Sequence, residues 1–168
     1  DLAEYIKENF PKIDLALTTN GSSIVFMHQP LIKKIFHDVD VSVDFPETNS
    51  HNDIRGHSEA WTWTRQALEI LTTVGIPRSI VTCITSQTTN TDIEKLLELA
   101  NYYRATWRIN WFRQAGRGSS NLRISAKRAW EIIAFLSDKV TFYCLDSIFA
   151  GPLNIDCRPC PAGHGTCR

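Results

Sequence analysis

Three cysteines near the end of the sequence have the residue type and spacing of a metal site. Cys157, Cys160 and Cys167 form a C-x2-C-x6-C run interrupted by glycines and a proline. Thiolates are soft ligands that suit zinc and iron–sulfur clusters, so we expect these three side chains to bind a metal. Such sites usually have four ligands, and the fourth could be His164, Cys144 or a further cysteine. The alternative is three free thiols.

Polar side chains also gather where apolar, strand-like runs end. Ser42 and Asp44 lie two residues apart in one run, as do Arg108 and Asn110 in another, so each pair shares one face of its strand. The carboxyl ends of parallel strands meet at one edge of a sheet, where a polar ligand pocket is expected. The alternative is that strands become polar where solvent begins. Further residues at predicted strand ends are Thr18, Thr19, Asn20, Thr82, Thr85, Ser86 and Arg113.

The elements that must position these residues alternate along the chain. Apolar residues at helical spacing predict helices, of which the first ends at Pro11, the third stops at Gly75, the fourth is capped by Asn90 or Thr91, and the last is capped by Ser125. Apolar runs between the helices predict strands. The predicted helices cover 2–10, 29–38, 58–74, 90–105 and 125–139, and the predicted strands 13–18, 39–45, 78–86, 106–114 and 140–147.

Helix and strand in regular alternation predict an α/β fold with a parallel sheet. The strand run around Cys83 is apolar on both faces, as expected for a strand buried between other layers, and core packing is the expected role of Cys83 itself. An open doubly wound sheet and a partial (β/α) barrel fit this pattern equally well.

Composition narrows the class of protein. The 168 residues are 43% hydrophobic, and 18 Lys and Arg balance 18 Asp and Glu, which gives no net charge to attract nucleic acid or an anionic membrane. No apolar stretch approaches the ~20 residues of a membrane span, and no signal peptide is visible. Two of the five cysteines lie in core-like runs, which favours a reducing, cytoplasmic compartment. Because the sequence begins within a helical pattern and ends within a cysteine cluster, we expect a piece of a longer protein.

Several stretches together resemble the radical S-adenosylmethionine (radical SAM) superfamily. They are "DLAEYIKENFPKIDLALTTNGS", "DVDVSVDFPETNSHNDIRG", the helix ending in "TTVGI", and "NTDIEKLLELANYYRATWRINWFRQAGRG". The tail "CRPCPAGHGTCR" is similar to the start of a SPASM or twitch-type auxiliary iron–sulfur extension. The C-x3-C-x2-C loop that holds the SAM-cleaving cluster in this superfamily is absent from the sequence.

The resemblance implies the last part of a partial (β/α)6 barrel over residues 1–150 and the start of the extension over 151–168. Strands three to six of the barrel would be 13–18, 39–44, 79–85 and 107–112. It also implies 4Fe–4S clusters as cofactors beside SAM, and a cluster bound by Cys157, Cys160 and Cys167 together with a cysteine further along the chain.

The resemblance also implies site residues. Ser42 and Asp44 correspond to positions that contact the ribose or methionine part of SAM, and Arg55 to an arginine that reaches the methionine carboxylate. Plain structural roles are the alternatives: Asp44 as a strand cap, Arg55 as a surface arginine at a helix N-terminus, and His51 as a loop residue. The expected cofactor-binding residues are Ser42, Asp44, Arg55, Thr82, Asn20 and Arg108.

By the same resemblance, the parent enzyme would cleave SAM reductively to a 5′-deoxyadenosyl radical that abstracts hydrogen, in peptide or protein modification or in cofactor maturation. A flavodoxin or ferredoxin would supply electrons. Two other classes stay open: a zinc-binding α/β module without redox chemistry, and a phosphate-binding α/β enzyme supported by the arginines of "RQAGRG".

Overall fold

The structure is a computed structural model that describes residues 2–114, 120–137, 139, 144 and 145. The predicted extension 151–168, with Cys157, Cys160 and Cys167, lies outside the described residues. Among the helices of the described residues, none has the length and apolar character needed to cross a bilayer.

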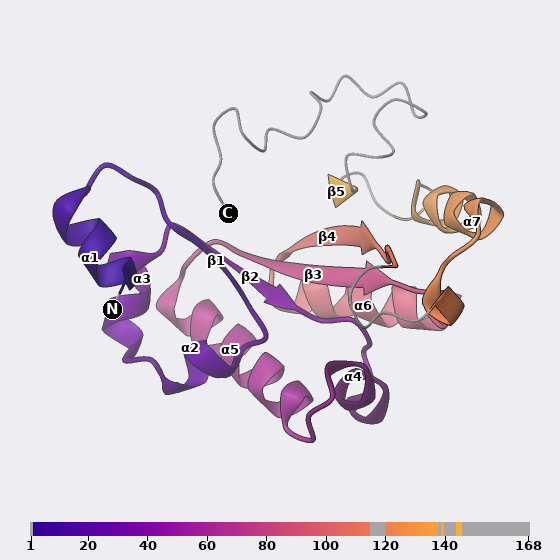
Figure 1. The fold of residues 1–168 in the computed structure, drawn as a ribbon, viewed down its shortest axis with the longest axis horizontal. Helices are drawn as coiled ribbons and strands as arrows, with labels where there is room; N and C mark the ends of the chain where they lie inside the picture. Colours follow the sequence, from indigo (N-terminus) through magenta and orange to yellow (C-terminus); the bar gives the residue numbers. More distant parts are fainter. Residues whose placement is uncertain (1, 115–119, 138, 140–143, 146–168) are drawn as a thin grey trace.

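The described strands form one parallel sheet whose spatial order, β1-β2-β3-β4-β5, is also their order along the chain (Figure 1). A doubly wound sheet requires the strand order to reverse at one point, so the unbroken order excludes that alternative for the described strands. Closure into a (β/α)6 barrel stays a prediction. The strands are β1 (Ala16–Thr19), β2 (Asp38–Ser42), β3 (Arg78–Ile84), β4 (Thr106–Trp111) and β5 (Cys144–Leu145).

The helices confirm most of the predicted ones. The predicted cap of α6, Asn90 or Thr91, was wrong, because the N-cap is Thr89: its hydroxyl accepts from the main chain of Asp92, and the Asp92 carboxylate accepts from the main chain of Thr89. Ser125 caps α7 as predicted, accepting from the N–H of Arg128 at 3.1 Å. The helices are α1 (Leu2–Asn9), α2 (Ser22–Phe26), α3 (Gln29–Ile35), α4 (Thr48–Arg55), α5 (Ala60–Val74), α6 (Asn90–Tyr102), the 3-10 helix η1 (Ser120–Leu122) and α7 (Ala126–Ser137).

α4 occupies a stretch that the sequence predicts as a loop. Its residues, TNSHNDIR, have low helix propensity and no apolar stripe, so no local signal marks it. The helix ends at Gly56, which adopts the left-handed conformation with φ 67°. Figure 1 shows α4 on the side toward which the strand arrows point, where the carboxyl ends of the strands lie.

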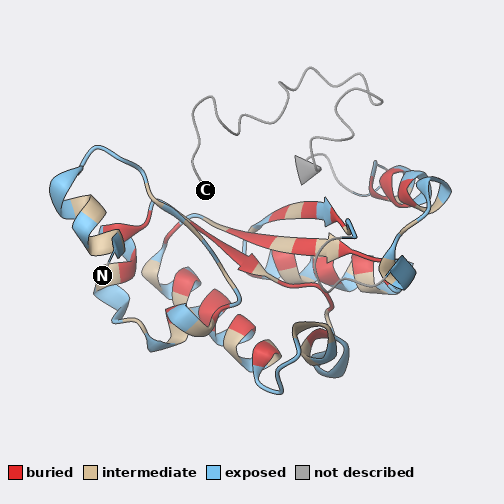
Figure 2. Ribbon diagram, in the orientation of Figure 1, coloured by how far each residue is buried: buried red, intermediate tan, exposed pale blue. Residues whose placement is uncertain are grey.

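The two faces of the sheet differ in character. Val39, Val41, Ile80 and Ile84 are fully buried and belong to the main hydrophobic core, together with Leu68 and Leu71 of α5 and Ile93 and Leu96 of α6. Figure 1 shows α2, α5 and α6 together on one side of the sheet, and in Figure 2 the buried residues of these helices face the strands. The alternate strand residues point to the opposite face, which carries the polar side chains.

A close contact at Gly21 fixes the turn after β1 against α5. Gly21 has φ 97°, and a Cβ atom there would lie 2.7 Å from the carbonyl oxygen of Trp63. Only glycine fits both the backbone conformation and the space. The turn therefore brings Asn20 next to α5, where the Thr64 hydroxyl donates to the Asn20 carbonyl oxygen at 3.3 Å.

Candidate functional site on the polar face of the sheet

Strand register places several of the predicted site residues on one face. Thr18 pairs with Asp40, Ser42 with Val81, Val81 with Arg108, and Cys83 with Asn110. Paired residues of parallel strands point to the same side, and residues two apart in a strand do so as well. The face opposite the helices therefore presents Thr18, Asp40, Ser42, Asp44, Cys83, Arg108 and Asn110.

Asp44 and Arg55 form the tightest polar contact on this face. An Oδ2 atom of Asp44 lies 2.7 Å from a terminal guanidinium nitrogen of Arg55, with side-chain exposures of 6% and 28%. The other carboxylate oxygen accepts the main-chain N–H of Cys83 at 3.0 Å. Burial raises the pKa of Asp44, while the Arg55 cation and the Cys83 N–H act against that rise. Arg55 lies at the C-terminus of α4, so the alternative of a surface arginine at a helix N-terminus was wrong.

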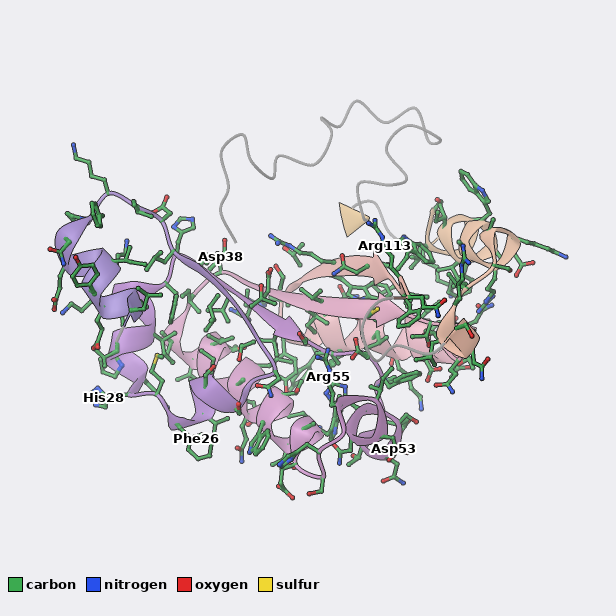
Figure 3. The ribbon with its side chains drawn as sticks, in the orientation of Figure 1. Phe26, His28, Asp38, Asp53, Arg55 and Arg113 are labelled. Carbon is green, nitrogen blue, oxygen red and sulfur yellow. The ribbon has the colours of Figure 1, made fainter. Side chains whose placement is uncertain are left out.

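The orientation of Arg55 suits a ligand on the sheet face. In Figure 3 Arg55 extends from α4 back toward the sheet, whereas Asp53 of the same helix points away from it. The Nε atom of Arg55 is buried and has no hydrogen-bond partner among the described residues. A buried donor without a partner costs about 1–3 kcal/mol, so an acceptor from a bound molecule would relieve it.

His51 is a buried residue that binds the main chain of Asp44, next to the Asp44–Arg55 pair. It is 1% exposed and lies within α4, so the prediction of a loop residue was wrong. Its Nδ1 accepts the main-chain N–H of Asp44 at 3.3 Å, and its Nε2 lies 3.4 Å from the Thr64 hydroxyl. An accepting Nδ1 places the proton of the neutral ring on Nε2. Burial, aided by the nearby Arg55 cation, lowers the pKa of His51 to about 4, so the ring is neutral at physiological pH.

A second ion pair lies further from the carboxyl edge. Arg108 of β4 reaches across β3 to Asp40 of β2, with 3.2 Å between the guanidinium and Oδ2, and Thr18 of β1 donates to the same oxygen at 3.5 Å. The Asp40 side chain is only 4% exposed, whereas that of Arg108 is 33% exposed. Sequence reasoning identified Arg108 but missed Asp40. The alternation of Asp40, Ser42 and Asp44 along one strand was the signal that could have revealed it.

Thr82 lies on the opposite face from the other predicted residues. It is fully buried against the helices, and its hydroxyl donates to the Val43 carbonyl oxygen at 2.7 Å and accepts the indole N–H of Trp107 at 2.9 Å. These bonds hold β2, β3 and β4 together. Its neighbour Cys83 lies on the polar face of the sheet instead. Burial raises the pKa of the Cys83 thiol to about 11, so the thiol stays protonated.

Ser42 and Asn20 complete the predicted set. Ser42 is half-buried between Asp40 and Asp44, and its hydroxyl makes no hydrogen bond to another described residue. The side-chain oxygen of Asn20 accepts from both the main chain and the hydroxyl of Ser22, so it stabilises the turn between β1 and α2. In the described part of the chain, no group of three or more His, Cys, Asp or Glu side chains is placed to bind a metal.

No protein-family model matches the sequence, and no curated protein does. Solved structures share its fold. "SuiB bound to S-adenosylmethionine" from Streptococcus suis superposes with a TM-score of 0.66 at 12% identity, over 99% of this chain and 40% of SuiB. TYW1 with a lysine-pyruvate adduct gives 0.63 at 19% identity, over 87% and 48%. The enzyme anSMEcpe with bound AdoMet and the Kp18Cys peptide gives 0.56 at 17% identity, over 88% and 44%.

Two of these structures hold S-adenosylmethionine, and the chain shares the fold of all three at low sequence identity. The chain spans less than half the length of each of them. The resemblance of the central stretches is thereby confirmed at the level of the fold.

Proposed function

We propose that the chain is part of a radical SAM enzyme and that the polar face of its sheet binds S-adenosylmethionine. The observation that carries this proposal is the Asp44–Arg55 pair at the carboxyl edge of the sheet, with the buried Arg55 Nε still lacking an acceptor. A carboxylate such as that of the methionine part of SAM supplies the acceptor that this guanidinium lacks, in charge-assisted hydrogen bonds.

The other groups of the face suit the rest of the molecule. The hydroxyl of Ser42 and the amide of Asn110 make no hydrogen bonds to described residues, so both can serve the ribose hydroxyls or the amino group. Asp44 has both carboxylate oxygens engaged, so its role is to hold Arg55. Arg108 and Asn20 extend the proposed contact surface. Thr82 has no such role, because its hydroxyl is bonded within the core.

Beside a reduced 4Fe–4S cluster that gives up one electron, bound SAM would be cleaved reductively and would supply the chemistry for hydrogen abstraction from a substrate. The residues of this chain bind and orient SAM, and the apolar core beneath the face keeps water from one side of the site. We propose a peptide or protein substrate, because the neighbour anSMEcpe binds a peptide. Cys157, Cys160 and Cys167 would hold an auxiliary cluster, and a flavodoxin or ferredoxin would supply the electron.

A binding experiment tests the central contact. Arg55→Lys keeps a cation beside the buried Asp44 but loses the planar fork of the guanidinium. Isothermal titration of the purified protein with SAM should show Kd raised about tenfold or more, the effect of losing a charge-assisted hydrogen bond of about 1.5–3 kcal/mol. The matched control is Arg65→Lys on α5, whose side chain is 48% exposed on the helix layer. Unchanged affinity in Arg55→Lys, or no SAM binding by the parent protein, would refute the assignment.

A further inference from the structure

A hollow beyond the carboxyl end of β4 has the lining of an anion subsite. Its volume is about 650 Å³, and it lies between the end of β4 and the start of α7. Trp111 and Phe112 supply aromatic walls, and Arg113 and Arg123 supply positive charge. None of the described residues that line it is acidic. The size is that of an ordinary ligand pocket, about 300–1,000 Å³.

The backbone on both sides of the hollow is anchored to β3 and the loop that follows it. Phe112, directly before Arg113, donates its main-chain N–H to the Ile84 carbonyl oxygen at 2.9 Å. On the other side, Ser86 donates its N–H to the carbonyl oxygen of Leu122 at 3.0 Å, directly before Arg123, and its hydroxyl to that of Asn121 at 2.6 Å. The two arginines therefore come from segments that are held by β3 and by the loop directly after it.

The charge of the hollow contrasts with that of its neighbour. A second hollow, of about 690 Å³, is lined by Asp53, Asp92 and Leu122 of η1, whereas Arg123 directly after η1 lines the first. A negatively charged group at this edge is therefore repelled from the α4 side and attracted to the β4 side. Figure 3 shows Arg113 at the end of β4, the edge at which the proposed SAM contacts lie.

We infer that this hollow receives the carboxylate of an acidic residue in a peptide substrate. The inference rests on the proposed function, since it names the substrate class of that site. Guanidinium groups bind carboxylates in a planar, charge-assisted geometry, and the aromatic walls suit the apolar stem of a glutamate or its neighbours. In the described part of the chain, no carboxylate pairs with Arg123.

Phage display tests the inference. A library of short random peptides is selected for binding to the immobilised protein. The peptides retained by the parent protein should be enriched in Asp and Glu about tenfold over the starting library, as one charge-assisted hydrogen bond allows. The double variant Arg113→Gln/Arg123→Gln should lose this enrichment. Lys127→Gln is the matched control, because Lys127 is exposed in the first turn of α7 without lining the hollow. Absence of acidic enrichment, or its persistence in the double variant, would overturn the inference.

Arg55→Lys separates this inference from the proposed function. If both hold, that variant loses SAM affinity and retains acidic peptides as the parent does. If SAM does not bind but acidic selection depends on the two arginines, the subsite stands and the proposed cofactor is wrong. If SAM binds through Arg55 and the selected peptides are not acidic, the subsite is wrong and the proposed function stands.

Discussion

The main-chain N–H of Asp44 donates to Nδ1 of His51 across 3.3 Å. Through this bond the turn after β2 is tied to α4, and through Thr64 and the Asn20 carbonyl oxygen α4 is tied to the turn after β1. Arg55 lies one helical turn after His51, so both side chains leave the same side of α4. The buried histidine thereby fixes the helix that presents the arginine to the face.

Replacing His51 should weaken both the fold and the site. His51→Ala removes a buried ring and leaves the Asp44 N–H without an acceptor, which should cost about 2–4 kcal/mol of unfolding free energy. His51→Asn should cost less, because its amide oxygen can accept that N–H. Urea unfolding of the two variants measures the difference. Equal losses in the two variants would show that the hydrogen bond to Asp44 contributes nothing.

The same histidine predicts an acid-sensitive fold. In the unfolded chain His51 takes up a proton near pH 6.5, but in the folded chain only near pH 4. The unfolded state holds more protons between these values, so the unfolding free energy should fall as pH drops through that range, by about 3 kcal/mol in all. Asp44, whose pKa is raised by burial, contributes a slope of opposite sign.

Comparing how the unfolding free energy of two proteins depends on pH separates the contribution of His51. Unfolding free energies of the parent protein and of His51→Asn are measured from pH 4 to pH 7. Asp44 contributes to both profiles, so the difference between them comes from His51. The parent should therefore lose more stability than the variant as the pH falls from 6.5 toward 4. Parallel profiles would mean that His51 is not held neutral.

The Asp40–Arg108 pair should respond asymmetrically to mutation. Arg108→Gln removes a cation from the Asp40 carboxylate, which is 4% exposed, and should cost about 3–5 kcal/mol. Asp40→Asn leaves a guanidinium that is 33% exposed and can turn to water, so the loss should be about 1 kcal/mol. Thermal unfolding of both variants gives the order. A larger loss for Asp40→Asn would contradict this burial argument.

Thr82→Val separates a structural role from a cofactor role. The substitution keeps the shape but strands the indole N–H of Trp107, which is buried, so stability should fall by about 1–3 kcal/mol. Its affinity for SAM should stay within about twofold of the parent, since the hydroxyl faces the helices. A large loss of SAM affinity at unchanged stability would restore Thr82 to the site.

Periodicity alone was enough to predict the elements whose burial repeats along the chain. β2 alternates valines with Asp40 and Ser42, and α5 and α6 carry apolar stripes, so the parallel sheet and its polar edge followed from local patterns. α4 could not be predicted in this way, because its residues favour no helix and its place depends on contacts made by His51. The sequence also could not show which face of β3 each side chain occupies. The pattern predicted where β3 ends, but only the strand register shows that Cys83, and not Thr82, shares a face with Asp44.

Hydrogen–deuterium exchange with and without SAM tests most directly whether the polar face is the SAM site. If it is, SAM should slow exchange in peptides that cover 42–46, 51–56 and 108–112, and leave α1 and α3 unchanged, because the proposed contacts all lie at one edge of the sheet. Protection confined to other segments, or equal protection in Arg55→Lys and the parent protein at the same SAM concentration below saturation, would contradict the account.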